Sequence, residues 1–298
     1  MISDNMRGAA LMVAGQVAFV INDAFMKALA GDVPFLQAMF LRGVMATVIL
    51  LVIASLLGQL SFRISPGDRW RMAIRTICEA LAAYFFISAL FNMPLANAVA
   101  ILQMLPLSIA LAAYLFMGEP LGWRRLTAVL IGFVGVMLII RPGFDGFSIW
   151  SLNVLAAVVA VTIRDLVTRR MASKLPSLMV ALAGATGVMV FSGIGTVFTT
   201  WDPVSLGEYA KLFGATLGIL GAYIFSVLMM RVGEVSFVVP FRYSSLVAAL
   251  ILGLLVFGEW PDAITLLGSA IVVGTGLYML YREVKLRRAI ASASIRPS

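Results

Sequence analysis

The sequence contains no histidine, a single cysteine and few charged residues. Of its 298 residues, 62% are hydrophobic and 12% are charged, whereas an ordinary soluble domain carries about 25% charged residues. A disulfide within the chain is excluded because Cys78 has no partner cysteine. Zinc sites and proton relays built on histidine are excluded as well. We therefore expect no metal and no cofactor, and the mean hydropathy of +1.03 predicts a chain that lies in a lipid bilayer.

Ten long apolar segments follow one another with short connections. A bilayer core takes about 20 apolar residues per helix, so each of these segments is predicted to span the membrane. The predicted spans are 7–29, 34–58, 70–91, 94–117, 121–140, 147–168, 177–199, 212–230, 235–257 and 263–281. The longest polar connections, 59–69 and 201–211, are too short to form a separate domain. The expected fold class is therefore an all-α membrane protein with ten transmembrane helices.

The basic residues gather on one side of the predicted bundle. A formal net charge of +8 would favour nucleic-acid binding only on the basic face of a soluble fold. Here sixteen basic residues fall on the side that holds both termini, whereas only Lys27, Arg141 and Lys211 fall on the opposite side. The sixteen are Arg7, Arg63, Arg69, Arg71, Arg75, Arg124, Arg125, Arg169, Arg170, Lys174, Arg231, Arg282, Lys285, Arg287, Arg288 and Arg296. By the positive-inside rule, both termini are predicted to face the cytoplasm, in contact with anionic membrane lipid and with no nucleic-acid partner.

The two halves of the chain resemble each other. The segment 21–36 matches 163–178 at an offset of 142, and the ends of the fourth and ninth spans match at offsets of 140 and 141. The polar and proline pairs carry the most weight: Asp23 with Asp165, Pro34 with Pro176, Glu119 with Glu259 and Pro120 with Pro261. An offset near 140 corresponds to five spans, and an odd number of spans reverses the second copy across the bilayer. We therefore predict two inverted five-helix repeats, 1–145 and 146–285, around a central cavity, followed by a basic cytoplasmic tail, 286–298. Such repeats imply alternating access to a site near the midplane.

The ends of the fourth and ninth spans also carry a recognisable motif. Residues 116–121 read Phe-Met-Gly-Glu-Pro-Leu and precede the helix 122–142, and residues 257–261 read Phe-Gly-Glu-Trp-Pro. These segments resemble the hallmark of the EamA family of the drug/metabolite transporter superfamily, and the resemblance extends over essentially the whole chain. It implies ten helices, cytoplasmic termini, a cavity lined mainly by spans 1, 3, 4, 6, 8 and 9, and metabolite transport, commonly export. Members of similar length and layout include bacterial amino-acid exporters of the YddG type.

The resemblance implies a transporter that exports small molecules across the bacterial inner membrane, with amino acids, including aromatic ones, as the preferred substrates. Small-residue stripes such as Gly214, Gly218 and Gly221 favour close packing of helices within one chain, with dimerisation as the alternative, so we expect function as a monomer. The main alternative is multidrug or quaternary-ammonium efflux, which would favour an acid in an aromatic chamber. A membrane-embedded enzyme would need a nucleophile with a partnered base, and none is visible in the sequence. A receptor would need an appended ligand or signalling domain. We therefore expect a transporter without enzyme activity.

Charged residues within the spans are predicted to form an outer and an inner layer. Burying a charge costs about 2.5 to 3.5 kcal/mol on insertion scales, so each one needs an explanation. By helix geometry, Asp23 lies about 9 Å and Arg42 about 12 Å inside the outer end, on adjacent spans, so these two side chains are candidate partners in an ion pair. The charges expected in the cytoplasmic half are Glu79, Arg164, Asp165 and Arg242. We predict that Asp23, Arg42, Glu79 and Asp165 act in gates whose ion pairs break and re-form, or in ion coupling.

A structural interpretation of these acids remains open. Each one has a base four residues along its own helix that would neutralise it locally. The three pairs are Asp23 with Lys27, Glu79 with Arg75 and Asp165 with Arg169. The repeated glutamates, Glu119 and Glu259, stand at predicted helix starts, where a carboxylate favours the helix dipole and free backbone amides, so we expect them to be structural.

Neutral polar and aromatic groups lie between the two charged layers. The predicted substrate-binding residues are Asn22, Tyr84, Gln103, Tyr223, Arg242 and Tyr243. Pro106 follows Gln103 and Pro240 precedes Arg242, and helices interrupted at related positions of two halves are typical of transporter sites. The guanidinium fork of Arg242 suits a carboxylate. The alternative is that these groups only bond neighbouring helices.

Overall fold

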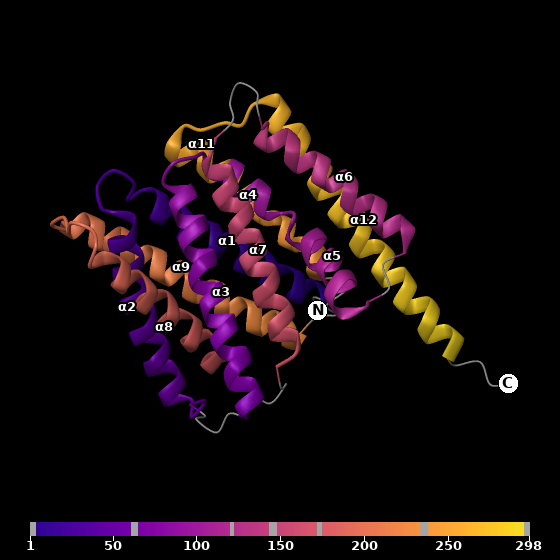
Figure 1. Ribbon diagram of the computed structural model, residues 1–298, viewed down its shortest axis with the longest axis horizontal. Helices are drawn as coiled ribbons and strands as arrows, with labels where there is room; N and C mark the ends of the chain where they lie inside the picture. Colours follow the sequence, from indigo (N-terminus) through magenta and orange to yellow (C-terminus); the bar gives the residue numbers. More distant parts are fainter. Residues whose placement is uncertain are drawn as a thin grey trace.

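In the part of the chain that the computed structural model describes, ten helices are long and apolar enough to cross a membrane, which confirms the predicted fold class. The described residues are 4–60, 65–119, 122–142, 148–171, 175–232 and 238–294. The elements, shown in Figure 1, are α1 (Asp4–Lys27), α2 (Phe35–Leu56), α3 (Pro66–Leu90), α4 (Leu95–Leu102), α5 (Leu105–Met117), α6 (Trp123–Ile140), α7 (Trp150–Arg169), α8 (Ser177–Thr196), α9 (Leu206–Val232), η1 (Val239–Tyr243), α11 (Ser244–Phe257) and α12 (Ala263–Ser294).

Two of the ten spans are interrupted, and both interruptions occur where the sequence places a proline. The fourth span breaks between α4 and α5, and Pro106 lies in the first turn of α5. The ninth span begins with the short 3-10 helix η1, which contains Pro240, and continues as α11. Proline interrupts a helix because it lacks a backbone donor and clashes with the preceding turn. The same spans end alike, at Gly118 and Gly258, which adopt left-handed φ values of 68° and 65°.

The helices pack in pairs that join the two halves of the chain. In Figure 1, α2 lies beside α8 at one side of the bundle and α6 beside α12 at the other, and the contacts between these elements agree. Between these two pairs, α1 packs along α9 and α3 packs along α7. The predicted repeat relates the first span to the sixth and the third span to the eighth, so it would exchange these last two pairs. The inverted repeat itself stays a prediction.

Glycines allow two of these helix pairs to approach closely. A Cβ atom on Gly218 of α9 would lie 2.9 Å from the Ala18 oxygen and the Asn22 nitrogen of α1. A Cβ atom on Gly135 of α6 would lie 2.9 Å from the Gly268 oxygen of α12. Small residues at such crossings let helix backbones pack against each other in a membrane, where apolar burial alone does not favour association.

Several contacts stabilise the outer end of the bundle. By the predicted orientation, the outer end is the one that holds Lys27. Gln37 is fully buried, and its amide exchanges two hydrogen bonds with the backbone of Asp202 in the connection between α8 and α9. Arg141, at the end of α6, pairs with Asp262 just before α12. The hydrogen bonds from the Arg141 guanidinium and the Thr265 amide lower the pKa of Asp262 to about 2.

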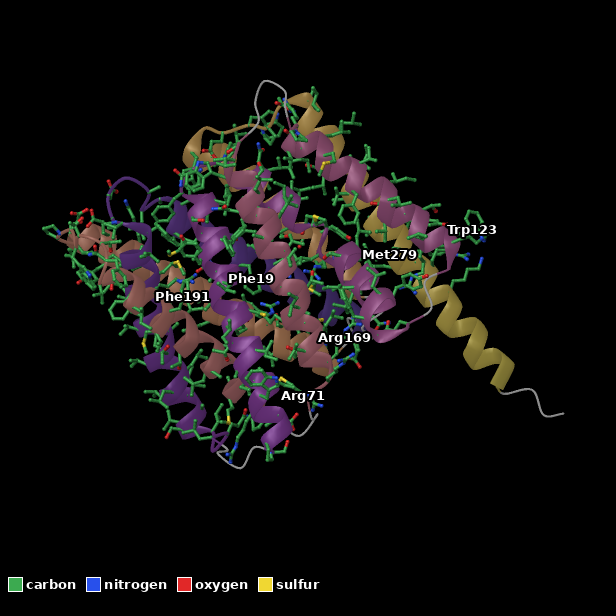
Figure 2. All side chains as sticks on the ribbon, in the orientation of Figure 1. Phe19, Arg71, Trp123, Arg169, Phe191 and Met279 are labelled. Atoms are coloured by element: carbon green, nitrogen blue, oxygen red, sulfur yellow. The ribbon has the colours of Figure 1, made fainter. Side chains whose placement is uncertain are left out.

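Exposed aromatic residues mark the opposite end. Trp123 begins α6, is 71% exposed and projects away from the bundle (Figure 2), as expected for a side chain at a membrane interface. The last helix is longer than predicted, because α12 continues past the expected end at residue 281 to Ser294. Much of the segment predicted as a tail is therefore helical.

Candidate substrate cavity

A cavity of about 300 Å³ lies between the helices at the centre of the bundle. Its walls come from α1, α2, α3, α4, α7, α8 and α9 and from the start of the ninth span, so α2 and α8 contribute beyond the predicted set of spans. Seven predicted site residues line it: Asn22, Asp23, Arg42, Glu79, Gln103, Tyr223 and Arg242. The volume lies at the lower end of the range that is usual for small-molecule sites.

The outer charged group is built around Asn22 rather than around a direct ion pair. Arg42 Nη1 of α2 donates a hydrogen bond of 2.7 Å to Asn22 Oδ1 of α1. Asn22 Nδ2 in turn donates to Asp23 Oδ1 at 2.8 Å. Arg42 is only 8% exposed, so this chain of hydrogen bonds stabilises its buried charge. The alternative pairing of Asp23 with Lys27 is wrong, because the ion pair of Lys27 is made with Glu259.

The inner charged group joins α3 to α7. Arg164 Nη1 lies 3.1 Å from Glu79 Oε2, and its Nη2 lies 2.8 Å from Asp165 Oδ1. Glu79 also accepts a longer ion pair from Arg75, at 3.6 Å, so the helix-local alternative is confirmed for Glu79. For Asp165 it is wrong, since Arg169 pairs with Glu119 instead. A four-residue spacing could not identify these partners, because Arg164 directly precedes Asp165 on α7, whereas Glu79 and Glu119 come from other parts of the chain.

The centre of the cavity presents hydrogen-bond donors without partners. Gln103, at the end of α4, is 5% exposed, and its Oε1 accepts a hydrogen bond of 3.3 Å from Ser245 Oγ of α11. Its Nε2 has no partner among the described residues. Arg242 also lines the cavity, and no ion pair within the described ranges includes it. Buried polar groups are normally satisfied, so these donors are suited to a bound solute.

Tyr223 and Phe19 form an aromatic part of the wall. Both line the cavity, and their rings meet edge to face with centroids 6.3 Å apart. Figure 2 labels Phe19, on α1. Phe86 of α3 also lines the cavity. These rings offer an apolar surface beside the charged groups.

The structure places three predicted site residues outside the cavity wall. Tyr84 packs between Phe35 and Phe191, at centroid distances of 5.4 and 5.7 Å. The helical period explains this position, because the cavity face of α3 carries residues 79, 82, 83 and 86, and residue 84 points to another face. Tyr243 packs against Gly276 of α12, since it stands one residue after Arg242 and successive residues of a helix face different sides. Asp165 reaches the site only through Arg164.

Other cavity residues were not predicted to form the site. They include Gln16, Phe19, Phe86, Arg164 and Ser245. The sequence did indicate Arg164 as a possible site residue, because it is a charged residue within a span and precedes Asp165. Ser245 lies 142 residues after Gln103, which is the offset of the predicted repeat. Among the described residues, no group of histidine, cysteine, aspartate and glutamate side chains could hold a metal ion.

The comparison with protein families bears on the first half of the chain. Residues 6–141, which include the first five spans, match the EamA-like transporter family. This match confirms the resemblance to the EamA family over that part of the chain. A crystal structure that is 20% identical agrees in fold, with a TM-score of 0.60 over 91% of this chain and 96% of the other.

Three curated relatives are transporters of different small molecules. This chain is 28% identical to the S-adenosylmethionine uptake transporter of Rickettsia bellii over 194 residues, which are 64% of this chain and just under two thirds (66%) of that protein. It is 28% identical to the riboflavin transporter of Rhizobium johnstonii over 241 residues, 74% of this chain and 72% of that protein. It is 24% identical to the pseudopaline exporter CntI of Pseudomonas aeruginosa over 272 residues, 89% of this chain and 93% of that protein.

These names support a multi-pass membrane transporter of small metabolites rather than an enzyme. They do not support amino-acid export in particular, because each relative carries another substrate name and the names include both uptake and export.

Proposed function

We propose that this EamA-like protein exports a small zwitterionic metabolite of the amino-acid class across a bacterial inner membrane by alternating access. The observation that carries the proposal is the central cavity, which combines a carboxylate, unpartnered cationic and amide donors, and aromatic rings. A zwitterion with a carboxylate and an ammonium group matches this combination.

The anionic end of the solute is proposed to bind at Gln103 and Arg242. The Gln103 amide supplies an unpartnered donor, and the guanidinium of Arg242 supplies a planar pair of donors that suits a carboxylate. Ser245 links the two positions, because its hydroxyl donates to Gln103 Oε1 or to the Arg242 backbone oxygen at 3.3 and 2.9 Å. A bound carboxylate would satisfy donors that the protein leaves without partners.

The cationic end is proposed to bind at Asp23. Among the described residues, the only hydrogen bond to its carboxylate comes from Asn22, so an oxygen remains available on the cavity wall. Arg42 reaches Asp23 only through Asn22. An ammonium group would therefore meet an acceptor that is not already held by an arginine.

The aromatic surface of Phe19, Phe86 and Tyr223 is proposed to accept an apolar or aromatic side chain. S-adenosylmethionine, the substrate named for the Rickettsia bellii relative, also ends in an α-amino-acid group and therefore falls within the proposed class. Residues from both halves of the chain line this cavity, and we propose that the protein functions as a monomer.

Quaternary-ammonium efflux is the second candidate. Asp23 beside Phe19 favours it, because a carboxylate and an aromatic ring together attract a lipophilic cation. Three arginines, Arg42, Arg164 and Arg242, line the same cavity and weaken this candidate by like-charge repulsion.

Transport by the purified protein in liposomes tests the proposal. Vesicles would be loaded with aromatic and aliphatic amino acids, S-adenosylmethionine, riboflavin or a lipophilic quaternary amine, and protein-free vesicles would serve as the control. We expect protein-dependent release of the zwitterions. Movement of the quaternary amine alone would replace the proposal by efflux of lipophilic cations, and movement of riboflavin alone would contradict the zwitterion class.

A further inference from the structure

An ion pair connects three segments at the outer end of the bundle. Lys27, the last residue of α1, lies 3.0 Å from Glu259, which follows α11. Lys27 Nζ also donates a hydrogen bond of 2.6 Å to the Met93 oxygen, and Glu259 Oε2 accepts one of 3.1 Å from the Leu95 amide at the start of α4. The Lys27 side chain is only 11% exposed. This contact therefore holds the first, fourth and ninth spans together at one end.

A second ion pair of the same kind lies at the opposite end. Arg169, the last residue of α7, lies 3.6 Å from Glu119, which follows α5. The pair is longer than the outer one, and the two side chains are 50% and 54% exposed. The neighbouring Arg170 adds one hydrogen bond, of 3.4 Å, to the Phe116 oxygen of α5. The sixth span is thus joined to the fourth through a looser contact.

The two ion pairs occupy corresponding positions in the predicted repeat. Arg169 follows Lys27 by 142 residues, and Glu259 follows Glu119 by 140 residues, which are the offsets at which the halves of the sequence match. In each pair, the base ends the first span of one repeat and the glutamate follows the fourth span of the other. The glutamates belong to the motif that ends the fourth and ninth spans.

We propose that the Lys27–Glu259 and Arg169–Glu119 pairs are reciprocal latches that close the cavity alternately at its outer and inner ends. The proposal rests on the alternating access proposed above. The outer pair is short and largely buried, whereas the inner pair is longer and exposed. This difference corresponds to a state in which the cavity is closed towards the outer side and opens towards the inner side. In the opposite state the inner pair tightens while Lys27 and Glu259 separate. A contact present in only one of two states shifts their populations by its own free energy.

A purely structural role would give a different result. The bond from the Leu95 amide shows that Glu259 also stabilises the start of α4. If this were the only role of Glu259, loss of the bond would lower the stability of the protein in both states, because a helix cap is needed in each. The cavity would then not open preferentially to either side of the membrane. Accessibility of the cavity from each side therefore separates a latch from a cap.

The test uses a cysteine reporter in the cavity. In a Cys78→Ser background, Ala46→Cys places a thiol on the cavity wall, four residues after Arg42 on α2. Right-side-out and inverted vesicles are treated with a membrane-impermeant maleimide. We expect Glu259→Gln to raise the labelling rate from the outer side about two- to fivefold and to lower it from the inner side, in keeping with the strength of partly exposed ion pairs. Glu119→Gln should shift labelling in the opposite direction.

Charge exchange and a matched control complete the experiment. Lys27→Glu combined with Glu259→Lys restores the ion pair but not the hydrogen bonds with Met93 and Leu95. It should therefore move labelling from the pattern of the single variants towards that of the parent, and it keeps the test valid if a single variant folds poorly. Arg141→Gln removes another outer ion pair, which joins α6 to the start of α12, and should leave labelling unchanged. Equal labelling in all variants, or a shift in the same direction for Glu259→Gln and Glu119→Gln, overturns the proposal. Labelling does not require a known solute, so the two proposals can fail separately. If labelling shifts as expected but no solute is released, the proposed function is overturned and the proposed latches are not.

Discussion

Asn22 lies between two residues that the sequence suggested as direct partners. The sequence placed Asp23 and Arg42 at similar depths on adjacent spans, and the structure connects them through the Asn22 amide. An amide can accept from a guanidinium and donate to a carboxylate at once. Both charges are thereby stabilised although the contact is indirect.

A double-mutant cycle tests this connection. Asp23→Asn and Arg42→Gln should each lower the thermal stability of the purified protein in detergent, and their effects should be coupled by about 0.5 to 3 kcal/mol, as is usual for residues in one network. Because the coupling passes through Asn22, it should fall towards zero when the cycle is repeated in an Asn22→Ala background. Additive effects in the parent background would contradict the hypothesis that the residues of the outer charged group act as one unit.

Arg242 permits a sharper test of solute recognition. Replacement by Gln removes the charge while leaving a hydrogen-bond donor, so a carboxylate-bearing solute should bind at least about tenfold more weakly, as expected when a charge-assisted hydrogen bond is lost. Arg242→Lys should lose less. Titration calorimetry of the purified protein measures the affinity. Tyr84→Phe is the matched control, because this hydroxyl lies outside the cavity wall, and equal affinity in the parent and Arg242→Gln proteins would contradict the assignment.

Helix packing supplies a prediction at the scale of elements. Gly218→Ala would bring a Cβ atom to 2.9 Å from backbone atoms of α1, which cannot move independently of that helix. We expect a loss of about 1 to 3 kcal/mol in the free energy of unfolding, as is typical of overpacking. Gly274→Ala is the control, because its Cβ would meet nothing within 4 Å and alanine favours the helix. Denaturation in mixed micelles compares the two, and equal stability of both variants would argue against close packing of α1 and α9.

The helices were predictable from sequence, whereas the partners between them were not. Long apolar segments predicted ten spans because a bilayer demands about 20 apolar residues per helix, and prolines predicted the interruptions at α5 and η1. Ion pairs were sought at four-residue spacing along one helix. That rule found Glu79 with Arg75 but missed the partners of Lys27 and Arg169, which come from distant spans.

The direction of a side chain was only partly predictable. Gln103 and Arg242 line the cavity, but depth along a span does not decide which face of the helix meets the cavity. Tyr84 lies off the face of α3 that carries residues 79, 82, 83 and 86, and Tyr243 stands one residue after Arg242, where a helix turns its side chain to another side. A hydropathy pattern does not reveal which face of a span lines a cavity.

For the whole molecule, the asymmetry of basic residues fixes the expected orientation. Sixteen basic residues on one side and three on the other predict that the two termini lie together in the cytoplasm. Ser3 and Ser298, where tags would be attached, lie outside the described residues, but the prediction depends only on the number of spans and on the distribution of basic residues. With this orientation, the connection between α8 and α9 lies on the outer side, together with Lys27 and Glu259.

Tags at Ser3, Ser298 and Pro203 test the orientation and the order of the spans together. We expect the first two tags to report the cytoplasm and the tag at Pro203, in the connection between α8 and α9, to report the outer side. Seven spans separate Pro203 from the N-terminus, and an odd number of crossings places it on the opposite side of the membrane. Protease protection of tags in right-side-out vesicles provides the measurement. If only one of the two terminal tags lay outside, the ten-span count would be contradicted. If all three positions were reversed, the count would stand, but Lys27 and Glu259 would face the cytoplasm and the two latches would exchange sides.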